Sequence, residues 1–118
     1  MFKTLFAQTR VPSITPQQAK KRLASADPVI LLDVRTAEEY AEIHIPNSIS
    51  LPLDRLKQKI DAVAPDKDAE IVVYCLSGAR SATACGQLAA MGYTNVSNLG
   101  GIHSWPYETE RGRGNGSW

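Results

Sequence analysis

Cysteine is scarce in this sequence, which has only Cys75 and Cys85 among its 118 residues. The two thiols form no CxxC motif and no cluster with histidine, which argues against a structural zinc site and against a disulfide scaffold. The chain also lacks an apolar run close to the roughly 20 residues of a membrane span, and the apolar stretch in MFKTLFAQTR is too short for a secretory signal. We therefore expect reduced thiols, no membrane partner and a cytoplasmic location.

An excess of charge of either sign is absent as well. Lysine and arginine number 13 against 12 acidic residues, a formal net charge of +1, so the composition favours no nucleic-acid partner. With 43% hydrophobic and 21% charged residues, the chain has the composition of an ordinary soluble globular protein of about one domain. We expect an N-terminal lead-in over residues 1–12, a domain over 13–107, and a flexible polar tail over 108–118.

Short apolar runs alternate with segments of helical pattern. Strands are expected in PVILLDVR, SISLPL, IVVYC and NVSNLGG. Capping boxes, Thr15 with Gln18 and Thr36 with Glu39, predict two helix starts. A further helix is expected in LDRLKQKIDAV, with Asp54 as its N-cap. Another is expected over GARSATACGQLAAMG, and a short one in IHSWPYE. Strands alternating with helices predict an α/β fold with a parallel sheet, whose ligands bind beyond the carboxyl ends of its strands.

The stretch CLSGAR places a thiol, a glycine and an arginine at one of those strand ends. A free thiol has a pKa of about 8.5, and only the thiolate is a good nucleophile, so a reactive cysteine needs positive potential nearby. The residues after Cys75 lead into a helix whose first N–H groups have no internal partner. Gly78 allows a left-handed turn that aims these groups at one spot, and Arg80 adds a permanent charge. We predict a cup for a small anion with the Cys75 thiolate at its floor.

Four segments, in order, resemble the rhodanese-like family of single-domain sulfurtransferases. CLSGARS resembles the family's C-x-x-G-x-R-S active-site loop, and LLDVRTAEEY resembles its D-x-R segment and the helix that follows. HIPNSISLPL resembles its HIP-then-strand segment, and LGGIHSW its double glycine followed by tryptophan. The likeness covers residues 13–107. It implies a three-layer α/β/α fold with a five-stranded parallel sheet.

The resemblance also implies a mechanism and a set of site residues. The Cys75 thiolate would attack the outer sulfur of thiosulfate or a persulfide donor, and the resulting persulfide would pass its sulfur to a thiol, cyanide or a protein acceptor. We expect neither a cofactor nor a metal ion. The residues expected to bind the sulfur donor are those of the loop, Leu76, Ser77, Gly78, Ala79 and Arg80, with support from Ser81, Asp33 and Arg35.

Two other functions stay open. A rhodanese module without enzymatic turnover could carry sulfur or bind a protein partner. Related phosphatases and arsenate reductases use a longer C-x5-R loop, whereas four residues separate Cys75 from Arg80, and Tyr74 stands where the phosphatase signature has histidine. Family members that favour thiosulfate often carry a further basic residue in the loop. Leu76 and Ser77 are neutral, which leaves room for a persulfide donor.

Several further residues are expected to support the fold rather than react. Cys85 lies on the helix after the loop and is expected to pack in the core. Asp33 and Arg35 are expected to form an ion-pair network that orients the loops. His44 is expected to have a structural role, and Trp105 to anchor the last helix. His103 follows the double glycine and is expected near the rim of the site.

Overall fold

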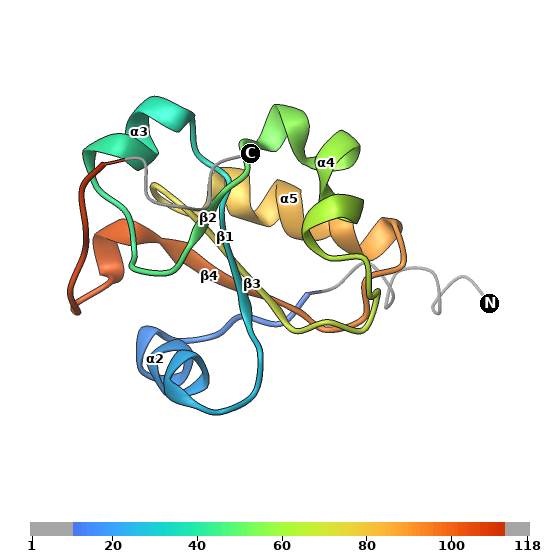
Figure 1. Ribbon diagram of the computed structural model, residues 1–118, viewed down its shortest axis with the longest axis horizontal. Coiled ribbons are helices and arrows are strands. Elements are labelled where there is room, and N and C mark those ends of the chain that lie inside the picture. The colour runs from blue at the N-terminus through green and yellow to red at the C-terminus, as the bar shows by residue number, and fades with distance from the viewer. Residues whose placement is uncertain (1–10, 113–118) are drawn as a thin grey trace.

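The computed structural model describes residues 11–112, which form helices on both faces of a parallel sheet (Figure 1). The strand order is β2-β1-β3-β4, and every neighbouring pair is parallel. The strands are β1 (Ile30–Asp33), β2 (Ile49–Ser50), β3 (Ile71–Cys75) and β4 (Val96–Gly101). The helices are α2 (Pro16–Ala24), α3 (Ala37–Glu42), α4 (Leu56–Val63) and α5 (Ala79–Ala90), with 3₁₀ turns η1 (Leu53–Arg55) and η2 (Ile102–Ser104).

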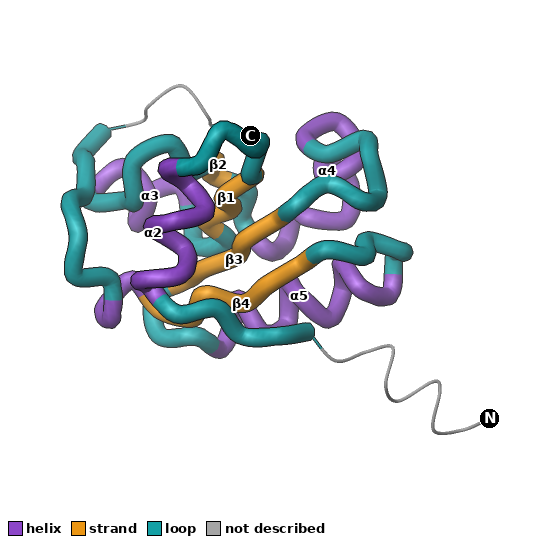
Figure 2. Tube along the Cα trace, turned by 90° about the horizontal axis from the view of Figure 1, so that it is seen from below, coloured by secondary structure: helices purple, strands orange, loops and turns teal. Residues whose placement is uncertain are grey.

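The two faces of the sheet bury different hydrophobic clusters. Leu32 and Val73 pack under α4 and α5, whereas their chain neighbours Leu31 and Val72 point to the opposite face and pack under α2. Figure 2 shows α2 in front of the sheet and α5 on its other side. The uninterrupted apolar runs of β1 and β3 are therefore explained by burial on both faces. The predicted three-layer α/β/α fold with a parallel sheet is confirmed.

The strand count differs from the five that the resemblance implied. Within residues 11–112 the sheet has four strands, and the position beside β4 holds only a single parallel bridge between Ser13 and Asn98. The hydrogen bonds at this bridge run from Ile14 N to Asn98 O, 3.0 Å, and from Asn98 N to Pro12 O, 2.9 Å. Pro12 has no N–H to donate and Pro16 already begins α2, so no longer strand fits between them.

Both predicted capping boxes are present. The Thr15 side chain accepts from Gln18 N, and the Gln18 side chain accepts in return from Thr15 N. The same reciprocal bonds join Thr36 and Glu39 at the start of α3. These bonds satisfy N–H groups that a helix N-terminus otherwise leaves without a partner.

The prediction of Asp54 as an N-cap is wrong. Residues Leu53–Arg55 form the 3₁₀ turn η1, and α4 begins after it with Arg55 in the cap position and no side-chain capping bond. The Pro52 carbonyl accepts from Arg55 N at 2.8 Å, which closes the chain into the tighter turn before the α-helix starts. Asp54 therefore lies inside a turn rather than ahead of a helix.

The C-terminal part of the domain is held by Trp105. The short helix expected in IHSWPYE is the 3₁₀ turn η2, which ends just before Trp105. The indole is 9% exposed and its N–H donates to Glu108 O at 3.1 Å, as expected for an anchor. Residues 108–112 of the predicted tail contact the domain, since Glu110 and His44 exchange backbone hydrogen bonds and Gly112 N donates to Ala41 O. Residues 113–118 lie outside the described residues.

Within residues 11–112, no helix has both the length and the hydropathy that crossing a membrane would take.

Candidate active site

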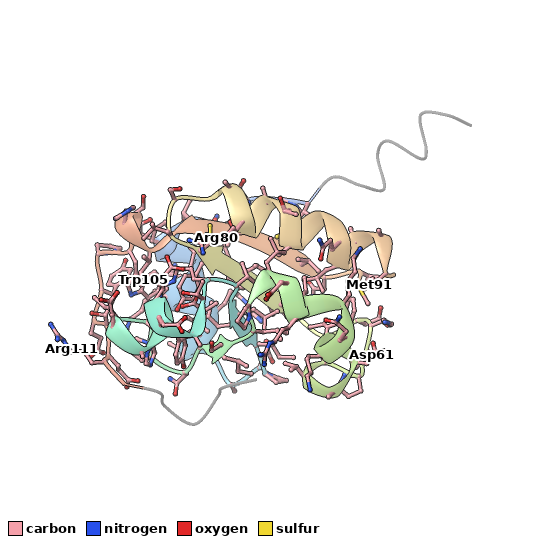
Figure 3. The ribbon with its side chains drawn as sticks, turned by 90° about the horizontal axis from the view of Figure 1, so that it is seen from above. Asp61, Arg80, Met91, Trp105 and Arg111 are labelled. Atoms are coloured by element: carbon pink, nitrogen blue, oxygen red, sulfur yellow. The ribbon has the colours of Figure 1, made fainter. Side chains whose placement is uncertain are left out.

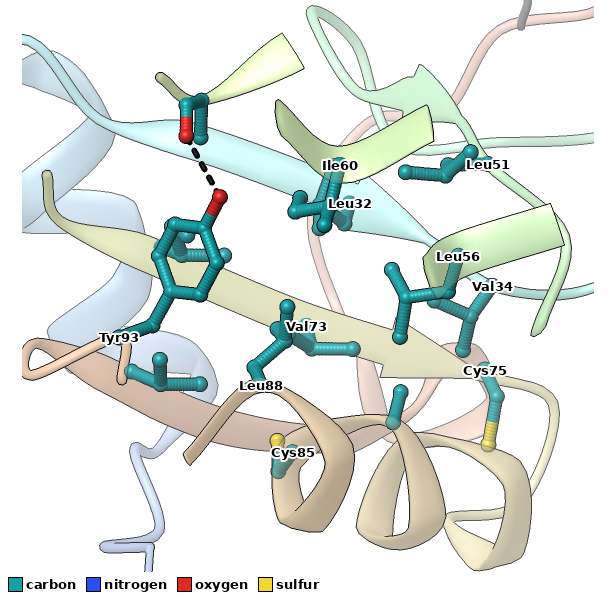
Figure 4. Close-up of a cluster of buried hydrophobic side chains, with 14 residues drawn as sticks. Leu32, Val34, Leu51, Leu56, Ile60, Val73, Cys75, Cys85, Leu88 and Tyr93 are labelled. Atoms are coloured by element: carbon teal, nitrogen blue, oxygen red, sulfur yellow. Dashed lines mark hydrogen bonds between the residues drawn. The ribbon is translucent and has the colours of Figure 1, made fainter. Parts of the chain in front are cut away.

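The loop of the candidate site begins where β3 ends, at Cys75, and turns into α5 through Gly78. Gly78 has φ +114° and occupies the N-cap position of α5, a left-handed conformation that glycine adopts without a steric cost. This turn brings the Gly78 N–H back toward the strand end, where it donates to Cys75 Sγ at 3.0 Å. Figure 4 shows the Cys75 side chain at the end of β3, facing the first turns of α5.

Opposing effects act on the pKa of Cys75, and their net result is a lowered pKa. Burial of the side chain, which is 1% exposed, by itself raises the pKa because it disfavours the charged thiolate. The Ser81 side chain and the backbone N–H groups of Ser81, Gly78 and Ser77 outweigh burial, since each stabilises the thiolate by a hydrogen bond. The hydrogen bonds thus shift Cys75 toward the thiolate in spite of its burial, and the thiolate is the nucleophilic form of cysteine.

Ser81 supports the sulfur from the first turn of α5. Its side chain is fully buried, and its Oγ lies 3.5 Å from Cys75 Sγ. The Ser81 hydroxyl donates to Gly78 O at 3.0 Å while the Cys75 thiol donates to Ser81 Oγ. Once the thiol has lost its proton, rotation of the hydroxyl lets Ser81 donate to the sulfur instead.

Arg80 is paired with a carboxylate rather than standing alone beside the sulfur. Its guanidinium binds Glu39 of α3 through both nitrogens, at 2.7 Å from Nη1 to Oε1 and 3.0 Å from Nη2 to Oε2. The hydrogen bond with Glu39 is the main cause of the raised pKa of Arg80; burial opposes it, and the charge of Cys75 adds to it. Figure 3 labels Arg80 at the end of α5 nearer the loop and Met91 at the other. The cup is therefore closed by an ion pair, where the sequence predicted a guanidinium.

Asp33 and Arg35 form a buried ion pair at the carboxyl end of β1, next to β3 in the sheet. Arg35 Nη2 donates to Asp33 Oδ2 at 2.6 Å, and both side chains are at most 2% exposed. The same nitrogen donates to Ile43 O at 2.6 Å, which ties the segment after α3 to the strand end. This geometry fits the predicted orienting network. Arg35 is too buried to contribute an exposed charge.

The other predicted residues differ in how exposed they are. Leu76, Ser77 and Ala79 are exposed at its rim, and His103 is exposed in η2. Cys85 is 2% exposed in the core under α5. Burial, with the charge of Cys75 as a smaller cause, raises the pKa of Cys85 to about 12, which fits the predicted packing role.

His44 is buried and stacks on Tyr40, with ring centroids 3.8 Å apart. Its Nδ1 lies 2.8 Å from Tyr40 O and its Nε2 lies 3.3 Å from a Glu110 carboxylate oxygen. Among residues 11–112 no three His, Cys, Asp or Glu side chains are grouped to hold a metal ion.

Sequence reasoning missed two contributors to the site. Glu39 was identified only as the partner of Thr36 in a capping box, and its second role depends on a contact with Arg80, 41 positions away. Gly101 follows Gly100 at the end of β4, and its Cα packs against the loop backbone at Leu76 and Ser77. The double glycine was the available signal for this close approach.

The described residues form a single α/β domain. Its candidate site is centred on a cysteine at the carboxyl end of a parallel strand, where a backbone N–H donates to the sulfur. Residues 15–108 match the profile of the Rhodanese-like domain, so the chain belongs to that family.

The relatives of this chain include proteins named sulfurtransferases and a putative sulfur carrier protein of Bacillus subtilis. The chain is 40% identical over 96 residues to a protein of Allochromatium vinosum named sulfurtransferase, a match that spans 80% of this chain and 88% of that one. It is 41% identical over 71 residues to thiosulfate sulfurtransferase PspE of Escherichia coli, spanning 60% and 68% of the two chains. The crystal structure of a thiosulfate sulfurtransferase from Pseudomonas aeruginosa superposes with a TM-score of 0.81 at 27% identity, covering 90% of this chain and 21% of that longer one.

Proposed function

We propose that this protein transfers a sulfane sulfur through a persulfide on Cys75, from thiosulfate or a persulfide donor to a thiol or cyanide acceptor. The observation that carries the proposal is the Gly78 N–H, which donates to Cys75 Sγ at 3.0 Å from a left-handed turn. Together with Ser81 it favours the thiolate, the form that attacks sulfur. The names of the relatives support the same reaction class.

In the first half-reaction the Cys75 thiolate attacks the outer sulfur of the donor. A sulfur–sulfur bond forms to Cys75 as the donor's own sulfur–sulfur bond breaks, and thiosulfate leaves as sulfite. The terminal sulfur of the Cys75 persulfide is then attacked by the acceptor, and Cys75 returns as thiolate. The N–H groups of the loop would hold the negative charge in both states. A reducing compartment such as the cytoplasm would keep the thiol available between turnovers.

The size and charge of the loop weigh against phosphatase chemistry. The loop folds back on the sulfur at Gly78, three positions after Cys75. A nearly buried sulfur suits a donor that presents one terminal atom, and Arg80 already shares its charge with Glu39. A phosphate dianion would need a wider cradle with more free donors.

The mass of the intact protein after incubation with thiosulfate tests the proposal. We expect one added sulfur atom on wild type, removed by cyanide, and none on Cys75→Ser. The matched control is Cys85→Ser, which we expect to load like wild type because burial raises the pKa of that thiol to about 12 and keeps it protonated. A sulfur added to Cys75→Ser, or found on Cys85, would refute the assignment. Loading without catalytic turnover of cyanide or a thiol would instead identify a sulfur carrier.

A further inference from the structure

The ion pair between Glu39 and Arg80 removes positive charge from the rim of the site. Glu39 meets the guanidinium with both carboxylate oxygens, the geometry of a bidentate pair. The hydrogen bond from Arg80 is the largest cause that lowers the pKa of the Glu39 carboxyl group. Burial opposes it, hydrogen bonds from Thr36 add to it, and the pKa falls to about 2. The Glu39 carboxylate is therefore ionised at neutral pH. The pair is therefore permanent over the pH range in which the thiolate forms.

The same neutralisation applies to the other arginine near the loop. A hollow in the surface beside the loop is lined by Arg35, Thr36, Leu53, Arg80 and Gln87, among others. Arg35 is bound to Asp33, and Arg80 to Glu39. The exposed loop residues carry no charge, so the attraction for a donor comes mainly from backbone N–H groups. Such groups carry only partial charges, so they supply less counter-charge to a dianion than an unpaired guanidinium would.

We propose that Glu39 is a specificity-determining residue, which masks the charge of Arg80 and biases the site toward sulfane donors with one negative charge, such as alkyl persulfides and thiosulfonates, over the thiosulfate dianion. This inference rests on the proposed sulfur transfer and deepens it. Coulomb energy scales with the charge of the donor, so the carboxylate repels a dianion twice as strongly as a monoanion at the same place. Thiosulfate and methanethiosulfonate form a matched pair of donors. Both transfer their terminal sulfur, to leave sulfite and methanesulfinate respectively.

Glu39→Gln is the test variant because it changes charge with little change of shape. A glutamine at this position still completes the capping box with Thr36, so α3 keeps its N-terminal hydrogen bonds. Glu42→Gln is the matched control, since Glu42 is an exposed residue of the same helix and loses the same charge. The second-order rate constant of Cys75 loading is measured for each protein with each donor, from the mass of the intact chain.

We expect Glu39→Gln to raise the loading rate constant roughly tenfold with thiosulfate and about threefold with methanethiosulfonate. The Coulomb energy of the dianion is twice that of the monoanion, and the rate constant depends on this energy exponentially, so the factor for thiosulfate is about the square of the other. The gain with thiosulfate should shrink as salt is added, because ions screen exposed charges. Glu42→Gln should leave the ratio of the two donors unchanged. A purely structural role for Glu39 would change both rate constants by the same factor.

Equal changes with both donors, slower loading with both, or the same ratio change in Glu42→Gln would overturn the inference. If Glu39→Gln fails to fold, the wild-type protein decides: a thiosulfate rate that falls steeply with ionic strength would mean that Arg80 is not masked. If wild type loads sulfur from neither donor and from no alkyl persulfide, the proposed function itself fails. The two failures are therefore distinguishable.

Discussion

Gly101, at the end of β4, lies directly against the carbonyl oxygen of Leu76 in the loop that follows Cys75. A Cβ built on Gly101 would overlap that oxygen and would lie 2.8 Å from Ser77 Cα. The two segments are neighbours because Gly101 is in register with Cys75 in the parallel pairing of β3 and β4. The last strand therefore forms a rigid support under the loop that follows Cys75, the proposed nucleophile.

Gly101→Ala should displace the loop and slow sulfur transfer. The added methyl group meets backbone rather than the end of a flexible side chain, so the loop must move. Displacement by about 1 Å at a reacting centre costs roughly a hundredfold in rate. We expect kcat/KM for thiosulfate with cyanide to fall by roughly ten- to a hundredfold. The far-UV circular dichroism spectrum should stay that of a folded protein. Activity within about twofold of wild type would contradict the close packing.

Gly86→Ala should stabilise the protein and leave its activity unchanged. Gly86 lies inside α5, and a Cβ built there has no atom within 4 Å apart from the neighbouring backbone of the helix itself. Alanine in a helix interior is favoured over glycine by about 1 kcal/mol, because glycine loses more backbone freedom on folding. Urea unfolding should show a gain of about 0.5–1 kcal/mol. The variant also serves as the control for Gly101→Ala, since a loss of activity here would mean that any added methyl group is harmful.

The fold was predictable because its signals are local. Apolar runs of strand length and two capping boxes are read from a few neighbouring residues, and the structure has both. The start of α4 was misread since a polar Asp54 looks like an N-cap, whereas the Pro52 carbonyl closes a 3₁₀ turn around it. The local sequence does not show whether Asp54 caps an α-helix or lies inside a 3₁₀ turn, because both are compatible with a polar residue at that position.

The geometry of the candidate site was predictable as far as its residues lie in one contiguous stretch. CLSGARS contains the thiol, the left-handed glycine and Ser81, and the structure brings these together around the sulfur. The partner of Arg80 was not predictable, because Glu39 reaches it from α3 through tertiary packing. Charges in a sequence show their sign, and only the fold shows which of them are neutralised.

The pH dependence of alkylation should separate the two thiols. The Cys75 pKa is lowered, so its thiolate forms, and its reaction with iodoacetamide levels off, at a lower pH than for an ordinary thiol. Cys85, with a pKa of about 12, should stay unmodified below pH 9, roughly. Ser81→Ala removes a hydrogen bond that favours the thiolate, so the midpoint should rise by about one pH unit. Peptide mapping of the label shows which thiol has reacted. An unchanged midpoint for Cys75 in Ser81→Ala would show that the Ser81 hydroxyl does not act on the sulfur.

Asp33→Asn should destabilise the protein far more than the loss of an exposed carboxylate does. Asp33 is fully buried and neutralises Arg35, which is itself 2% exposed, so the variant leaves a buried guanidinium without a counter-charge. Breaking a buried pair in this way costs about 3 kcal/mol or more, since desolvation of the remaining charge is no longer offset. The free energy of unfolding in urea at neutral pH measures the loss.

The control is Asp27→Asn, whose carboxylate is 70% exposed and pairs with Arg22 at the surface. Such exposed pairs contribute at most about 1 kcal/mol, because water and salt screen them. Equal losses in the two variants would mean that the Asp33–Arg35 pair does not behave as a buried ion pair, and the strand end would need another source of rigidity.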